Sequence, residues 1–140
     1  MPARSVPRRL LNLTMRHIVP AVLLLVALIH LLPLAGVLGA AKLSSLYGIP
    51  VQDPNLEILM RHRAVLFGLL AAFLAYAAFH RPLHGLALVA AGVSVVSFLV
   101  LAVMVGGYNA ALSTVVKADI VALVLLVVAA ALHLRGAGEG

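Results

Sequence analysis

Four long runs of apolar residues constrain this chain more than any other feature. They cover residues 17–39, 54–79, 85–106 and 113–134. A helix needs about 20 mostly apolar residues to cross the roughly 30 Å of hydrocarbon in a bilayer, and it satisfies its own backbone hydrogen bonds. The connections between the runs are short. The sequence therefore predicts an all-α integral membrane four-helix bundle that forms a single domain over residues 1–140.

The composition supports a membrane protein and excludes several kinds of site. Hydrophobic residues make up 64% of the chain and charged residues only 10%, with a mean hydropathy of +1.18. A soluble domain is about half apolar and about a quarter charged. The absence of cysteine excludes a disulfide framework, a thiolate metal site and a thiol nucleophile. Neither a metal nor another cofactor is predicted.

The basic residues indicate an orientation in the membrane. The net charge is +6, but the arginines that flank the first run have no interleaved aromatic residues, so we expect no nucleic-acid partner. Alternating spans place six basic residues on one side: Arg4, Arg8, Arg9, Arg16, Arg81 and Arg135. The other side carries four: Lys42, Arg61, Arg63 and Lys117. We therefore expect a bacterial inner (cytoplasmic) membrane protein with both termini in the cytoplasm.

A signal peptide is a competing interpretation of residues 1–41. A basic start, an apolar run, Pro33 and the small residues at 39–41 fit that pattern. The apolar core of a signal peptide is about 7–15 residues long, however, and the run at residues 17–39 is longer. We therefore favour a first membrane span.

The second and fourth spans have different start signals. Asp53 followed by Pro54 is a strong start, since it combines an N-cap acceptor with the position where proline is tolerated. The connection before it, residues 40–53, contains the turn formers Gly48 and Pro50. The fourth run would be too short, at about 24 Å, if it began at Asp119. A start at Ser113 as N-cap gives a full crossing.

Two arginines lie inside the second span and are predicted to have different roles. At 100° per residue, Arg61 shares a face with Gly68, Ala72 and Ala75, and small residues at this spacing let membrane helices approach closely. Arg61 is therefore predicted to face the bundle. Arg63 is predicted to face lipid and to reach the headgroups by snorkelling, because it shares its face with the bulky residues Phe67, Leu70 and Leu74.

An inward-facing Arg61 needs a partner, because an unpaired charge in a low-dielectric interior is costly. Asp119 is the best candidate, since it lies about 9 Å into the fourth span and Arg61 about 10 Å into the second. His30 lies on the same leaflet side. Two alternatives remain open: Asp119 as the N-cap of a shorter helix, and His30 as a histidine hydrogen-bonded to a neighbouring carbonyl.

These residues belong to a predicted polar cluster at the outer ends of the helices. The other members are Glu57, Tyr47, Tyr108 and Asn109. Ionisable groups within a membrane span indicate a functional site, although the two tyrosines also fit an interfacial aromatic belt. On the opposite side, His80 and His84 have a metal-like spacing, but Pro82 between them disrupts a shared helical face, and no metal site is predicted.

The motifs "LIHLLP", "LYGIP", "RHRAVLFGLLAAF" and "GGYNA" follow one another along the chain. This order resembles a group of small bacterial four-span membrane proteins of unknown function, whose plan is similar to that of the DoxX-like proteins. The resemblance implies a fold and a topology. Such chains are sometimes labelled phosphopantetheine adenylyltransferase, a soluble α/β enzyme with an HxGH-type loop. We reject that label, because the only His-Gly pair here is His84-Gly85, with no βαβ pattern around it.

Three classes of function fit the sequence. In the first, the outer polar pocket binds an anionic or carbonyl-bearing amphiphile, such as a lipid, fatty acid or quinone, through Arg61 with Asp119 or His30. In the second, the chain is a non-catalytic accessory subunit of a larger membrane complex or a homo-oligomer. In the third, it is a membrane enzyme acting on a lipid-like substrate, which ranks last because no nucleophile, base and orienting group can be identified together.

Overall fold

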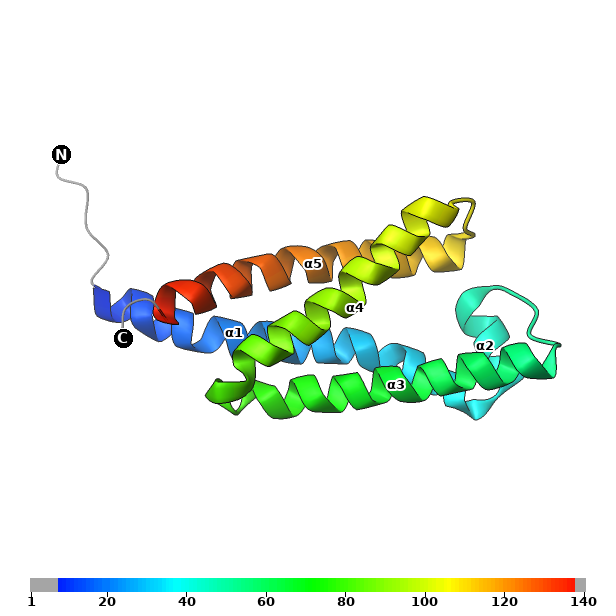
Figure 1. Ribbon diagram of the computed structural model, residues 1–140, viewed down its shortest axis with the longest axis horizontal. Coiled ribbons are helices and arrows are strands. Elements are labelled where there is room, and N and C mark those ends of the chain that lie inside the picture. Colours follow the sequence, from blue (N-terminus) through cyan, green and yellow to red (C-terminus); the bar gives the residue numbers. More distant parts are fainter. Residues whose placement is uncertain (1–7, 138–140) are drawn as a thin grey trace.

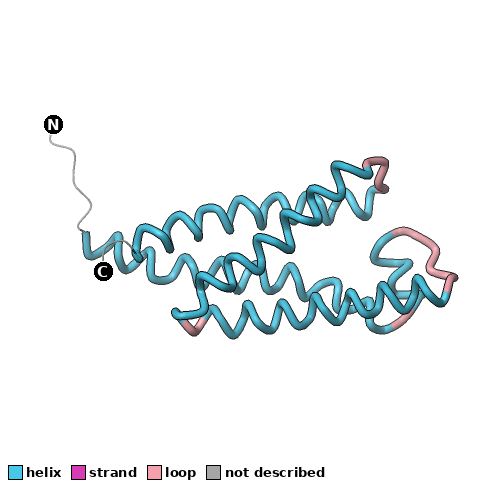
Figure 2. Tube along the Cα trace, viewed as in Figure 1, coloured by secondary structure: helices cyan, strands magenta, loops and turns pink. Residues whose placement is uncertain are grey.

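The computed structural model describes the backbone of residues 8–137 and the side chains of residues 16–136. All regular structure in this part of the chain is helical (Figure 2). In order, the elements are α1 (Arg8–Leu31), η1 (Leu32–Leu38), α2 (Ala40–Tyr47), α3 (Pro54–Ala78), η2 (Arg81–Leu83), α4 (His84–Val105) and α5 (Ala110–Ala137). Here η marks a 3₁₀ helix.

Four helical segments are long and apolar enough to cross a membrane. They are Arg16–Leu38, Pro54–Ala78, Arg81–Val105 and Ala110–Gly136. The prediction of an all-α bundle with four spans is therefore confirmed. The predicted start of the last span at Ser113 is wrong, because α5 begins at Ala110 and the Asn109 side chain accepts a hydrogen bond from the Leu112 amide at 2.9 Å.

The four long helices form a ring in which α1 packs most extensively against α3 and also against α5, and α4 packs against α5. In Figure 1, α3 and α4 are close at the η2 turn and diverge toward the other end of the molecule, where α2 lies. We call that end the α2 end. The opposite end carries η2, the start of α1 and the end of α5 (Figure 1).

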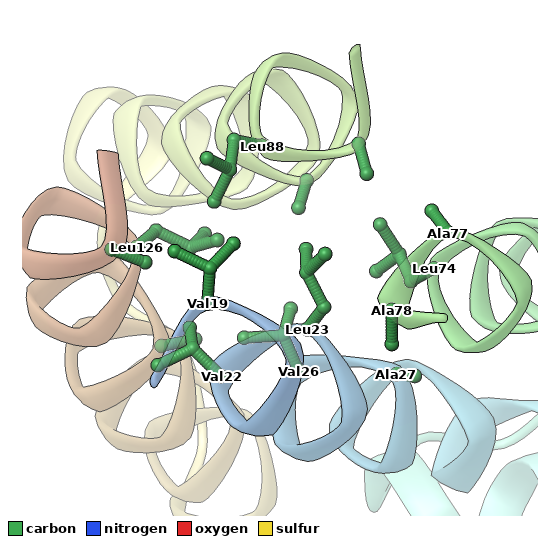
Figure 3. Close-up of a cluster of buried hydrophobic side chains, with 14 of the residues drawn as sticks. Val19, Val22, Leu23, Val26, Ala27, Leu74, Ala77, Ala78, Leu88 and Leu126 are labelled. Carbon is green, nitrogen blue, oxygen red and sulfur yellow. The ribbon is translucent and has the colours of Figure 1, made fainter. Parts of the chain in front are cut away.

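The main apolar core occupies the half of the bundle nearer η2. Leu23 of α1 lies toward Leu74 of α3 there, and Val19 lies beside Leu126 of α5 (Figure 3). Small residues of the other helices, including Ala87, Ala91, Ala122 and Ala129, are fully buried around them. Small residues let the helices approach closely, and close packing is what holds helices together in lipid.

A second, smaller core closes the α2 end. Pro33 cannot donate the hydrogen bond of an α-helix, and α1 gives way there to η1. Gly36 packs so closely that a Cβ atom would lie 2.6 Å from Leu43. Beyond Gly39, α2 folds back and buries Leu43 and Tyr47 with Val51. The connection 40–53, expected only to turn, thus contains a helix.

Both predicted signals at the start of α3 are confirmed. Asp53 Oδ1 accepts a hydrogen bond from the Asn55 amide at 2.7 Å, and Pro54 is the first residue of the helix. This cap satisfies one of the backbone donors that a helix start leaves unpaired. The position of this start sets the depth of every later side chain on α3.

Part of the predicted orientation signal lies outside the described residues. Arg4 precedes them, and Arg8 and Arg9 are in a segment of α1 whose side chains are not described. The orientation in the membrane therefore remains a prediction.

The buried face of α3 can be tested with two leucines on opposite sides of the helix. Leu74 is fully buried and Leu69 is 62% exposed. Leu74→Ala should destabilise the protein by roughly 2 to 5 kcal/mol, because it leaves a cavity in the core. Leu69→Ala should stay within about 0.5 kcal/mol of wild type, since lipid fills the space.

Thermal denaturation in mild detergent, followed by loss of the monodisperse species in gel filtration, measures this difference. Equal midpoints for the two variants would contradict the assigned orientation of α3.

Candidate functional site

A cavity of about 140 Å³ lies inside the bundle, between the main core and the cluster under α2. Its polar wall is formed by His30, Tyr47, Arg63, Thr114 and Asp119. Its apolar wall is formed by Ile29, Leu32, Pro33, Phe67, Phe98, Val115 and Ala118. Segments α1, η1, α2, α3, α4 and α5 all contribute. The cavity has room for several water molecules or for a compact polar group.

Arg63 is the cationic group of this cavity, and three aromatic rings surround it. Its guanidinium carbon lies 4.9 Å from the ring centre of Phe67, 5.7 Å from that of Tyr47 and 6.0 Å from that of Phe98. Such cation–π contacts stabilise a partly desolvated cation by about 0.5 to 2 kcal/mol each. These ring contacts supply no hydrogen-bond acceptor for the N–H groups of Arg63. Arg63 also makes no ion pair with a described residue.

The predicted orientations of Arg61 and Arg63 are both wrong. Arg61 is exposed and donates a hydrogen bond of 3.1 Å to Glu57, one turn earlier on the same helix. This pair lies outside the cavity, so Glu57 and Arg61 do not line it. Arg63 lines the cavity, whereas the prediction placed it entirely on the lipid-facing side of the helix.

The error came from the rule that small residues face protein and bulky residues face lipid. On α3 the buried residues are Ala64, Ala71, Leu74, Ala77 and Ala78. At 100° per residue, the centre of this buried face lies closer to Arg63 than to Arg61. Leu74, assigned to lipid, is fully buried, and Ala72, assigned to the bundle, is exposed.

His30 is held by two hydrogen bonds and is only 3% exposed. Its Nδ1 lies 2.9 Å from the Val26 carbonyl oxygen, which can only accept a hydrogen bond. Nδ1 is therefore the protonated nitrogen, and in the neutral ring Nε2 accepts from the Ser94 hydroxyl at 3.1 Å. The alternative in which His30 bonds a neighbouring carbonyl is thus confirmed. The second bond joins α1 to α4.

Asp119 faces the cavity from α5 and is 9% exposed. It lies nine residues into α5, so the alternative in which it caps a shorter helix is wrong. Arg63 also lies nine residues beyond the first residue of its helix. Both charges are therefore about 14 Å from their helix starts, at matching depth.

The predicted pairing of Asp119 with Arg61 is not formed, since Arg61 binds Glu57. Asp119 also makes no ion pair with any residue in the described part of the chain. The cavity thus contains a carboxylate and a guanidinium, each with free hydrogen-bonding capacity.

The remaining predicted site residues have separate positions. Tyr47 is buried, and its ring lies between Arg63 and the α2 cluster. Asn109 is outside the cavity, where its side-chain amide donates to the carbonyl oxygens of Tyr47 at 2.8 Å and Gly48 at 3.2 Å. Asn109 thus fixes the end of α2 against the start of α5. Tyr108 is exposed and does not line the cavity.

The histidines near η2 form no candidate metal centre. His80 Nδ1 donates to the Tyr76 carbonyl oxygen at 2.7 Å, and His84 Nε2 donates to that of Ala78 at 3.3 Å. Within residues 8–137, no group of three His, Asp or Glu side chains could hold a metal ion.

Several residues of the site were missed from the sequence. Phe67 and Phe98 resemble ordinary apolar residues of a span, and Ser94 is one of two isolated polar residues in "GVSVVSF". A correct start for α5 would have matched the depth of Asp119 with Arg63 rather than with Arg61. No sequence pattern marks Ser94 as the partner of His30.

Comparison of this chain with protein-family models, with curated proteins and with solved structures found no match. The resemblance to DoxX-like proteins therefore rests on the sequence motifs alone, and no family is assigned.

The role of Asn109 can be tested against its exposed neighbour Tyr108. Asn109→Ala removes the cap of α5 and both bonds to α2, and should lower stability by about 1 to 2 kcal/mol. Tyr108→Ala should change it by less than about 0.5 kcal/mol. Thermal denaturation in detergent compares the two, and an Asn109 variant as stable as the Tyr108 variant would show that the link does not hold α2.

Proposed function

We propose that this protein binds an amphiphile whose polar head occupies the cavity between Arg63, His30 and Asp119. The head presents carbonyl or anionic oxygen atoms to the N–H groups of Arg63. A lipid, a fatty acid or a quinone has this chemistry. The observation that carries the proposal is the unpaired guanidinium of Arg63, which lines a cavity at the depth of a membrane span.

Charge balance favours a neutral, carbonyl-bearing head over an anionic one. The cavity already contains one cationic group, Arg63, and one acidic group, Asp119. A carbonyl oxygen accepts from Arg63 without adding a second negative charge beside Asp119. A hydroxyl or amine on the same head would donate to Asp119. Arg63 and Asp119 then each have a partner, whereas His30 already has two within the described chain.

The α2 end faces the outer side of a bacterial inner membrane in this proposal, with both termini in the cytoplasm. The excess of basic residues near the first span supports this orientation. Membrane lipids are then the surrounding partners, and the cavity opens in the outer leaflet.

Native mass spectrometry of the protein extracted gently from its own membrane tests the proposal. Arg63→Gln should weaken ligand retention by about tenfold or more, because it removes charge-assisted hydrogen bonds. Arg61→Gln is the matched control, since Arg61 lies two residues away on the same helix and outside the cavity. It should retain the ligand as wild type does.

The outcomes separate the candidate functions. A small mass lost only in Arg63→Gln supports the binding site and identifies the ligand. A bare protein in all three samples contradicts the proposal. A second protein retained in all three, without a small ligand, supports the accessory-subunit alternative.

A second candidate function, a membrane enzyme, is favoured by the bond between Ser94 and His30. The Ser94 hydroxyl donates to His30 Nε2 at 3.1 Å, and the Val26 carbonyl oxygen orients the ring from the other side. A nucleophile, a base and an orienting acceptor, which could not be identified from sequence, are thus adjacent. Such a hydroxyl could attack an ester carbonyl and pass its proton through His30 to the leaving alcohol.

Labelling with a long-chain alkyl fluorophosphonate tests this alternative. A nucleophilic Ser94 should be modified in wild type and in Ser97→Ala, but not in Ser94→Ala. Ser97 is a suitable control because it lies on the same helix and donates to the Ser94 carbonyl oxygen. No modification of wild type would mean that the hydroxyl only joins α1 to α4.

A further inference from the structure

A second cavity, a groove of about 290 Å³, lies between α3 and α4. Its α3 side is formed by Arg63, Leu66, Phe67 and Leu70. Its α4 side is formed by Ser94, Ser97, Phe98 and Leu101. On each helix the first and last lining residues are seven positions apart, which corresponds to about 10 Å of groove at the α-helical rise. We call it the α3–α4 groove.

The groove adjoins the cavity described above. Arg63, Phe67 and Phe98 line both. His30 of the cavity and Ser94 of the groove are hydrogen-bonded to each other, so the two spaces lie on either side of that pair. They meet at the side chain of Arg63, which lines both.

The groove faces the region that lipid occupies. Leu66 is 51% exposed and Leu101 is 58% exposed, although both lie within membrane-spanning helices. Figure 1 shows that α3 and α4 diverge toward the α2 end. By contrast, α1 packs closely against α3, and α5 packs closely against α4. The side between α3 and α4 is therefore the candidate route from the cavity to the bilayer.

We propose that the α3–α4 groove binds the single apolar tail of the amphiphile and gives it lateral access from the bilayer. This inference rests on the proposed function and specifies the shape of its ligand. The head lies beside Arg63, the tail passes between Phe67 and Phe98, and the rest of the tail lies along the leucines of the groove. The ligand thus reaches the cavity without leaving the membrane.

Size and chemistry favour one tail. The cavity of about 140 Å³ holds a compact head, and the groove is one path bordered by two helices. The leucine and phenylalanine walls match a hydrocarbon chain. The hydroxyl groups of Ser94 and Ser97 do not prevent this, because both already have hydrogen-bond partners. Ser94 donates to His30, and Ser97 donates to the Ser94 carbonyl oxygen.

Photo-crosslinking in lipid nanodiscs tests the path. Two probes carry a diazirine in a single long tail: a neutral alkyl benzoquinone and a fatty acid. The proposal expects that at least one of them labels Leu66, Leu70 and Leu101 several-fold more than Leu69 and Val100. These two controls are lipid-exposed residues of the same helices that do not line the groove.

Two variants make the test specific. Ser97→Trp should fill the groove and abolish the excess labelling, whereas Val100→Trp on the neighbouring face of α4 should preserve it. Arg63→Gln should also abolish the excess, because the head loses its anchor. The probe that gives the excess shows whether the head is a neutral carbonyl compound or a carboxylate.

The proposed function and the groove can fail separately. Equal labelling of groove and control residues by both probes, with retention of the native ligand still dependent on Arg63, would overturn the groove and leave the binding site intact. Ligand retention that does not depend on Arg63 would instead overturn the proposed function itself. Excess labelling that persists in Ser97→Trp would also contradict the path through the groove.

Discussion

The cost of placing ionisable side chains inside a membrane span is the constraint on which the rest of this structure depends. Arg63, Asp119 and His30 lie well inside helices that are long and apolar enough to cross a membrane, and an uncompensated charge in hydrocarbon costs several kcal/mol. Each has a different compensation: Arg63 has aromatic faces, His30 has two hydrogen bonds, and Asp119 faces a cavity. The site exists because the bundle leaves room for these groups between two apolar clusters.

The short elements η1 and α2 make that arrangement possible. With eight residues, α2 is about 12 Å long and cannot cross a bilayer, so it packs over the end of the bundle. Tyr47 at its end places a ring against Arg63, and Asn109 holds the same residue by its backbone. The cover of the cavity is therefore connected to α5, and the integrity of the site depends on the packing of every segment.

The features predicted correctly depend on local chemistry or on length. The four spans follow from hydrophobic run lengths, and the start of α3 follows from the Asp53 side chain and the fixed backbone of Pro54. His30 and Asp119 were identified as unusual because ionisable groups in a span are rare. The start of α5 was placed too late along the chain, and the other main error concerns directions around a helix axis. The buried face of α3 is rotated around the helix axis relative to the predicted one. This rotation is large enough to exchange the roles of Arg61 and Arg63.

The sequence by itself determined that this chain is helical, how many times it can cross a membrane, and which ionisable residues must be accommodated within it. Each of these properties depends on the free energy of transferring single side chains from water to hydrocarbon and on backbone hydrogen bonds within one segment. Only the tertiary structure decided that Arg63 rather than Arg61 faces inward, that Ser94 binds His30, and that a groove opens between α3 and α4. Lipid and protein interior are almost equally apolar, so hydrophobicity does not distinguish the inward face of such a helix, and packing between helices does.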